Sequence, residues 1–181
     1  MPSQSRVAPA LGPNPPWSDF NNLQSSDDVW CSTNIPFGGG SRTLSIPQWG
    51  FTIPSGATVN GIEVSYEHSG GIPPAVPVTV TACTLTHPTL GPSSDLETGS
   101  VELLQNPDDT TYSKGGPTEL WGLTWTPANI NHNDFATNIL YEALDAAGVT
   151  VDLASCTVYY TGGDPGPMTS TNKFLPLLGT G

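Results

Sequence analysis

Turn-forming residues divide this chain into short segments along its whole length. Its 181 residues include 20 glycines and 19 prolines. Proline interrupts a helix and glycine weakens one, whereas short strands that are joined by turns accommodate both residues. A chain of this length is also long enough to build one domain with its own hydrophobic core. These features favour an all-β sandwich or barrel.

Alternation of apolar and polar residues marks the strands of the expected domain. Ile62, Val64 and Tyr66 alternate with polar residues, which predicts a strand with one buried and one solvated face. Residues 76–86 are rich in β-branched side chains and predict a second strand. Further strand patterns lie at residues 49–53, 100–104, 119–125, 135–144, 149–151 and 155–161. Residues 135–144 also fit helical spacing, and we favour a strand there.

About eight short strands without a reliable helix or repeat predict an antiparallel two-sheet sandwich, jelly-roll-like in topology. We expect this body to cover residues 42–161. Residues 1–41 combine prolines with serine, asparagine and aspartate, and they predict an extended N-terminal arm. Beyond the body, residues 162–181 begin with a cluster of glycines and prolines and predict a flexible C-terminal tail. Removal of residues 1–30 should then leave the body folded.

Large apolar side chains in the arm and the tail are candidates for contact with a partner. They are Trp17, Phe20 and Trp30 in the arm, and Phe174, Leu175 and Leu177 in the tail. The aromatic residues either anchor the arm on another subunit or fold back onto their own domain. The apolar residues of the tail require a groove, which belongs either to the same chain or to a partner.

The charge balance restricts the partners of the chain. It has 16 acidic and 4 basic residues, for a formal net charge of −12. The basic residues, Arg6, Arg42, Lys114 and Lys173, are too few and too scattered for the basic stripe that a nucleic acid requires. An anionic membrane surface would also repel the chain. We therefore expect no nucleic acid and no membrane as partner. A charged partner should present a basic face, unless the acidic surface serves solubility alone.

The three cysteines are widely spaced. Cys31, Cys83 and Cys156 form no C-x-x-C pair, which argues against a disulfide framework or a zinc site and predicts small buried side chains. Residues 1–11 lack the apolar run of a signal peptide, and no stretch is long enough to cross a bilayer. We expect synthesis in a reducing cytoplasm, with free thiols.

The carboxylates and amides of the sequence predict neither catalysis nor a metal site. Glu63 and Glu67 share one face of a predicted strand, but a solvated face explains them without a catalytic acid and base. Residues 131–134 offer oxygen ligands, yet the spacing of a complete calcium loop is missing.

The histidines and the glycine-rich segment lead to the same conclusion. His68, His87 and His132 are dispersed and should lie at the surface or in turns. Residues 37–41 are rich in glycine but lack the lysine and the helix of a phosphate loop, so we interpret them as a flexible connector. We expect that the protein is not an enzyme and binds no cofactor or metal ion.

Three segments resemble the pattern of small virion-associated proteins of tailed bacteriophages. They are WGFTIPSGATVNGIEV at residues 49–64, LWGLTWT at residues 120–126 and VYYT at residues 158–161. In that group an aromatic strand leads into an IPSGAT turn. A tryptophan-containing stretch precedes an Asn-Phe segment, often Asn-Phe-Gly, and a V.I.V.Y strand is the last strand of the domain. Here residues 133–136 read Asn-Asp-Phe-Ala instead. The resemblance implies a β-sandwich and a location in the virion, after synthesis in the host cytoplasm.

The function that we favour is a bacteriophage virion structural protein, a capsid decoration or cement subunit that bridges shell proteins through its arms. Its partners would be other virion proteins, either the major capsid protein or tail components, and further copies of itself. One alternative is a tail adaptor, fibre or tip module that contacts host glycans. A second alternative is a free carbohydrate-binding or hydrolytic domain.

Overall fold

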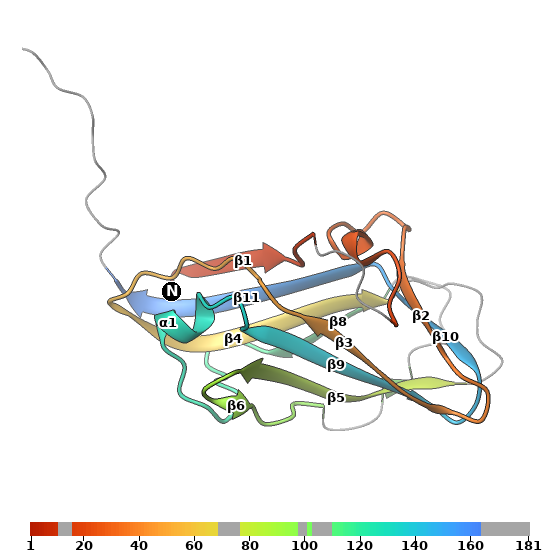
Figure 1. Ribbon diagram of the computed structural model, residues 1–181. Coiled ribbons are helices and arrows are strands. Elements are labelled where there is room, and N and C mark those ends of the chain that lie inside the picture. Colours follow the sequence, from red (N-terminus) through yellow and green to blue (C-terminus); the bar gives the residue numbers. More distant parts are fainter. Residues whose placement is uncertain (11–15, 69–76, 98–100, 103–109, 164–181) are drawn as a thin grey trace, which may run out of the picture.

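The regular structure of the described residues consists almost entirely of strands (Figure 1). The computed structural model describes residues 1–10, 16–68, 77–97, 101–102 and 110–163. Within these residues the helical elements are short: the 3-10 helix η1 (Phe20–Leu23) and the α-helix α1 (Pro127–Ile130). The prediction of an all-β fold is confirmed.

The strands form two sheets and a two-stranded ribbon. The first sheet has the order β1 (Ser3–Val7), β11 (Leu153–Gly162), β4 (Ala57–His68), β8 (Thr110–Gly115). The second sheet has the order β3 (Gly40–Ile46), β9 (Ala136–Ala143), β5 (Val78–His87), β6 (Gly91–Pro92), and β7 (Val101–Glu102) also pairs with β5. The ribbon pairs β2 (Cys31–Ile35) with β10 (Ala147–Val151).

The strand pairs are nested in the sequence. β1 pairs with β11, β2 with β10, β3 with β9, β4 with β8, and β5 with β6, so that each pair encloses the next. This nesting describes one long antiparallel hairpin, and rolling the hairpin up adds the pairs of β11 with β4 and of β5 with β9. The resulting orders, 1-11-4-8 and 3-9-5-6, are those of a jelly roll. The predicted sandwich topology is thus confirmed.

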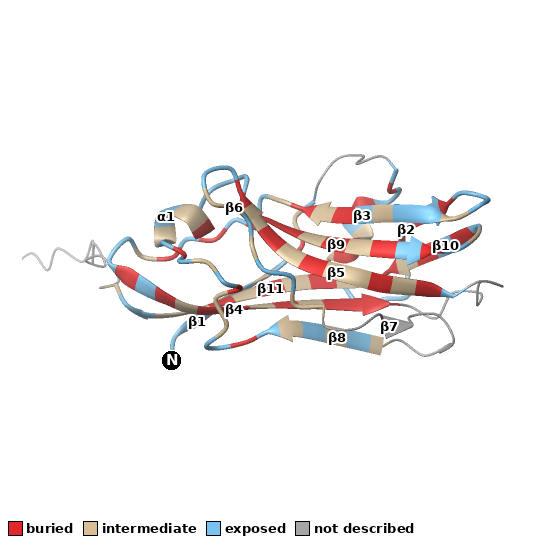
Figure 2. Cartoon of the chain, turned by 90° about the horizontal axis from the view of Figure 1, so that it is seen from below, coloured by how far each residue is buried: buried red, intermediate tan, exposed pale blue. Residues whose placement is uncertain are grey.

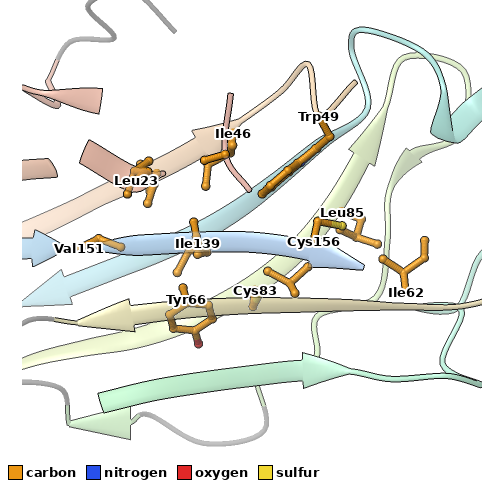
Figure 3. Close-up of a cluster of buried hydrophobic side chains, with 14 of the residues drawn as sticks. Leu23, Ile46, Trp49, Ile62, Tyr66, Cys83, Leu85, Ile139, Val151 and Cys156 are labelled. Atoms are coloured by element: carbon orange, nitrogen blue, oxygen red, sulfur yellow. The ribbon is translucent and has the colours of Figure 1, made fainter. Parts of the chain in front are cut away.

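The hydrophobic core lies between the two sheets. Buried residues alternate with more exposed ones along much of β5 and β9, because only one face of each strand is covered (Figure 2). Ile62 and Val64 of the first sheet face the core together with Leu85 and Ile139 of the second, and none is more than 1% exposed. Figure 3 shows members of this cluster on strands of both sheets.

The cysteines belong to this core, as their spacing predicted. Cys31, Cys83 and Cys156 are fully buried free thiols. Burial raises the pKa of Cys31 and Cys83 to about 12, and it raises the pKa of Cys156 as well. The thiols therefore stay protonated and act as small apolar side chains.

Most of the predicted strands are present. The patterns at residues 62–66, 76–86, 135–144, 149–151 and 155–161 correspond to β4, β5, β9, β10 and β11. The weak pattern at residues 100–104 contains the short β7, and its remaining residues lie outside the described part of the chain. Since residues 136–143 pair on both sides, with β3 and with β5, the strand reading of the ambiguous segment is confirmed.

The prediction of a strand at residues 49–53 is wrong, although the face that it assigned is right. Trp49, Phe51 and Ile53 are all buried, but the segment has no ladder partner in either sheet. Side chains hold it instead: the Asn131 amide accepts a hydrogen bond from the Ile53 nitrogen at 2.7 Å and donates one to the Ile53 carbonyl at 2.8 Å. An amide can thus replace a neighbouring strand, because it offers both a donor and an acceptor.

Residues 119–125 also form a loop instead of the predicted strand. Trp121 and Gly122 both have left-handed backbone conformations, with φ of 57° and 70°, which reverse the chain at that point. The Trp121 side chain is fully buried, and its indole N–H donates to the Ile62 carbonyl at 2.9 Å. The tryptophan thereby fills the space at the end of β8.

The prediction that residues 1–41 form an arm outside the body needs correction. β1 is an edge strand of the first sheet, and β2 forms the ribbon with β10. Between them Trp17 and Phe20 are only 3% and 2% exposed. Residues 1–10 and 16–41 therefore belong to the sandwich, because burial of these aromatic side chains and the pairing of β1 outweigh the freedom of an extended chain.

Removal of residues 1–30 should therefore prevent folding. Truncation of a buried Phe or Trp to Ala costs about 3–5 kcal/mol, and a domain has a total stability of about 5–15 kcal/mol. In the full chain, Phe20→Ala should lower the free energy of unfolding by about 3–5 kcal/mol in urea titrations. Val29→Ala is the control, since Val29 is 52% exposed. A truncated chain that unfolds cooperatively with unchanged stability would contradict this assignment.

Gly61→Ala should also be strongly destabilising, by about 3 kcal/mol or more. A methyl group at this position of β4 would overlap backbone atoms of Gly116 and Pro117, which cannot move aside as a flexible side chain would. Gly148→Ala in β10 is a matched control, because the nearest atom there, Asn34 Oδ1, would lie 3.8 Å away. We expect this control within about 0.5 kcal/mol of the wild type. Equal stability of the two variants in urea unfolding would contradict a steric overlap at Gly61.

Candidate functional site

Two turns lie side by side at one end of the molecule, where β2 and β10 meet β3 and β9 (Figure 1). We call residues 36–39 and 144–146 the corner. The Gly38 nitrogen donates to Asp145 Oδ1 at 3.0 Å, and the Ala146 nitrogen donates to the same oxygen at 2.8 Å. These two hydrogen bonds lower the pKa of Asp145, because they stabilise its charged form. The carboxylate thus ties the two turns together.

The corner carries the two most exposed large apolar side chains of the described residues. Phe37 is 89% exposed and Leu144 is 93% exposed. Single apolar side chains at a surface are ordinary. Two of them on adjacent turns, at nearly full exposure, form the kind of apolar feature that partners cover.

A pocket of about 460 Å³ adjoins the corner on the second sheet. It is lined by Gly40 and Ser41 of β3, by Thr79 of β5 and the preceding Pro77, and by Glu142 and Ala143 of β9 and the following Leu144. Ser41 pairs with Glu142, and Glu142 with Thr79, so these three lie in one row across the sheet. The volume is within the range of ordinary ligand pockets, and it suits a few apolar side chains beside an acidic group.

The structure places the residues that the sequence nominated as partner contacts as follows. Trp17 and Phe20 are core residues of this chain, and the Trp17 indole N–H donates to the Thr43 carbonyl at 2.8 Å. They fold back onto their own domain, so their assignment as partner contacts is corrected. Trp30 remains partly accessible, at 36% exposure. Phe174, Leu175 and Leu177 lie outside the described residues.

Sequence reasoning missed the corner. Residues 37–41 were interpreted as a flexible connector, whereas residues 36–39 form a turn that a hydrogen bond from the Gly39 nitrogen to the Pro36 carbonyl closes at 3.2 Å. A large aromatic residue that directly precedes three glycines was the available signal, because nothing in such a turn can cover it. Leu144 gave no signal, since it ends an apolar strand pattern.

Of the two carboxylates on the outer face of β4, Glu63 has a structural hydrogen bond. Glu63 accepts a hydrogen bond from the Tyr159 hydroxyl at 2.8 Å, which raises the pKa of Tyr159. Glu67 lies on the same face of β4, as predicted, but it is only 8% exposed, so the expectation of a solvated face is wrong at this position. Within residues 1–10, 16–68, 77–97, 101–102 and 110–163, no three acidic, histidine or cysteine side chains are grouped to hold a metal ion.

None of the helices in the described part of the chain has the length and apolar composition that crossing a membrane requires.

Comparison with known proteins leaves the chain without a family. No family model and no curated protein matches it. One solved structure, that of infectious bursal disease virus, Gx strain, is similar at 10% sequence identity and a TM-score of 0.32. The match covers 92% of this chain and spans 33% of the viral chain. A likeness at this level assigns neither a family nor a function, and the class that the structure itself defines is an antiparallel jelly-roll sandwich.

Two histidines that were expected at the surface or in turns are buried: His87, the last residue of β5, is 6% exposed, and His68 lies inside the sandwich. The prediction that His68 is at the surface or in a turn is wrong, because its side chain is 3% exposed and contacts Tyr66, Tyr112 and Tyr141 with ring centroids 5.4–5.7 Å apart. Its Nδ1 donates to the Thr150 carbonyl at 3.2 Å. Burial lowers the pKa of His68 to about 4, so the ring is neutral at pH 7.

Acid should therefore destabilise the protein through His68. The histidine pKa is about 6.5 in an unfolded chain and about 4 in the folded one, so the unfolded state binds a proton first as pH falls. The contribution of His68 to the free energy of unfolding is at its maximum above pH 6.5. It falls by about 3 kcal/mol as the pH is lowered toward 4. His68→Phe should lose less stability than the wild type between pH 7 and pH 4.5 in urea titrations. Val29→Ala, at an exposed site without a titratable group, should keep the wild-type dependence, and parallel curves for all three proteins would refute the role of His68.

Proposed function

We propose that this protein is a structural subunit of a virus particle, of the accessory type found in tailed phages, and in particular a capsid decoration or cement subunit. Jelly rolls occur in viral capsids and in lectins, so the fold supports the proposal without deciding it. The exposed corner carries the proposal, because it is a rigid apolar feature at the end of a packed sandwich.

The corner suits a role in assembly. Phe37 and Leu144 are exposed to solvent on two turns that hydrogen bonds to the Asp145 carboxylate join. The backbone of these turns therefore loses little conformational freedom when a neighbouring subunit covers the two side chains. Covering one such side chain stabilises a complex by about 1.5–3 kcal/mol. Each contact is modest, but many copies on one particle turn modest contacts into strong attachment.

The described cations support a protein partner over a nucleic acid. Arg6 donates to the carbonyls of Ser5 and Gly50, and Arg42 donates to the carbonyls of Asn34 and Ser41. Lys114 lies 2.9 Å from Glu97 in an ion pair. These side chains are engaged in three separate places and form no stripe that could follow a phosphate backbone. With its acidic surface, the chain suits a partner that presents a basic face.

A location in the phage tail, as a module that binds host glycans, stays an alternative function because of Trp30. Trp30 is partly exposed, and an accessible indole can stack on a sugar ring. A glycan-binding tail module would lose binding to host cells when Trp30 is replaced by Ala, whereas a cement subunit would keep its attachment to capsids. Binding of Trp30→Ala to cells and to tail-less heads separates the two locations.

The double variant Phe37→Ser, Leu144→Ser should lower occupancy on the particle at least tenfold. Loss of two exposed apolar contacts removes about 3 kcal/mol or more from attachment, while the fold is unaffected because neither side chain packs in the core. Occupancy is measured as copies per particle after the purified protein is added to particles that lack it.

The double variant Val7→Ser, Val29→Ser is the matched control, since these side chains are 50% and 52% exposed away from the corner. We expect it to bind as the wild type does. Unchanged occupancy of the corner variant, or absence of wild-type protein from purified particles, would overturn the proposed function.

A further inference from the structure

The described chain leaves the sandwich at the end opposite to the corner. Gly162, the last residue of β11, pairs with Ala57 at the start of β4. At the other end of β4, His68 contacts Tyr141, two residues before Ala143 of the pocket. In Figure 1, β2 and β10 accordingly lie at the right and the end of β11 at the left. The residues after position 163 thus begin about one strand length away from the pocket.

That distance is close to the limit of the chain's reach. β4 has 12 residues, and at about 3.3 Å per residue its ends are about 36 Å apart. Phe174 follows Gly163 by eleven positions in the sequence, and a fully extended chain of eleven residue steps spans about 36–40 Å. A random chain of eleven residues spans about 18 Å on average. Phe174 can therefore approach the pocket of its own chain only at full extension, whereas the pocket of a neighbouring copy has no such restriction.

The sequence beyond position 163 matches the pocket in its chemistry. Residues 173–178 read Lys-Phe-Leu-Pro-Leu-Leu, an apolar run that follows the one cation of residues 162–181. Pro77, Ala143 and Leu144 give the pocket an apolar lining, and the exposed Glu142 lines it between Ser41 and Thr79. A lysine directly before apolar residues would place its charge at Glu142 while the apolar residues cover Leu144 and Phe37. Such a peptide would cover the two most exposed large apolar side chains of the described residues.

We propose that residues 173–178 of one copy bind the pocket and corner of a second copy. The inference rests on the proposed function in one respect, since it names the neighbouring subunit that covers the corner. The two surfaces differ, so the contact is of the head-to-tail type. Repetition of a head-to-tail contact closes into a ring where its rotation allows and otherwise gives an open chain of subunits. Both outcomes suit a protein that ties neighbouring positions of a shell together.

Sedimentation velocity of the purified full-length chain tests this contact without any particle. We expect the wild type to shift from monomer to larger species as its concentration rises. A tail variant, Phe174→Ser with Leu177→Ser, and a pocket variant, Leu144→Asp, should each stay monomeric. Mixed one to one, the two variants should form a species of twice the monomer mass and nothing larger, because the mixture retains one intact tail and one intact pocket per pair.

A charge exchange supplies a second readout that a merely structural effect would not reproduce. Glu142→Lys should weaken self-association at least fivefold, and Lys173→Glu in the same chain should restore it. As a direct probe, a synthetic peptide of residues 170–181 should bind the tail variant and fail to bind the pocket variant.

Several results would overturn the proposal. A wild type that stays monomeric while the peptide binds the tail variant would show that the tail occupies the pocket of its own chain. A peptide that fails to bind, or a mixture that stays monomeric, would refute this occupant altogether. Self-association without attachment to particles would count against the virion role alone, and attachment by a chain that never self-associates would count against this inference alone.

Discussion

The pairing of β11 with β4 is the contact on which the rest of the molecule depends. β11 lies between β4 and β1, so the first sheet has no continuous ladder without it. It also continues from β10 through Asp152, a buried residue whose Oδ2 accepts hydrogen bonds from the nitrogens of Asp27 and Asp28 at 3.1 and 3.2 Å. The same strand thus fixes one sheet, the ribbon and, through the ribbon, the position of the corner.

Much of this fold could be predicted because strands and cores leave local signals. Alternation identified β4, β5, β9, β10 and β11, and the dispersed cysteines proved to be core residues. The first 41 residues could not be placed, because what orders them lies far away in the sequence: β1 pairs with residues 155–159. A proline-rich composition describes a local preference for extended chain, and an extended chain that finds a free sheet edge becomes a strand. Likewise, the pattern at residues 49–53 identified the buried face, but a pattern cannot tell a ladder from a single amide that takes its place.

The site was less accessible to sequence reasoning than the fold. Aromatic residues in a proline-rich segment fit partner contacts and core packing equally well, and two of them, Trp17 and Phe20, complete the core of this chain. Phe37 and Leu144 are separated by more than a hundred residues and lie on adjacent turns only because β2 pairs with β10 and β3 with β9. A side chain is exposed when no other part of the fold packs against it. The sequence shows directly only which residues are adjacent along the chain.

The central place of β11 has a consequence for the time at which the protein can fold. β11 follows all other described strands in the sequence, and both of its partners are synthesised long before it. Until it leaves the ribosome, β1 has no edge to join and β4 has an open side. Contacts between such distant segments also make folding slow, since a long loop must close before they form. The nascent chain therefore exposes unpaired strands throughout translation, a period in which a chaperone or a high net charge has the most effect on whether copies aggregate.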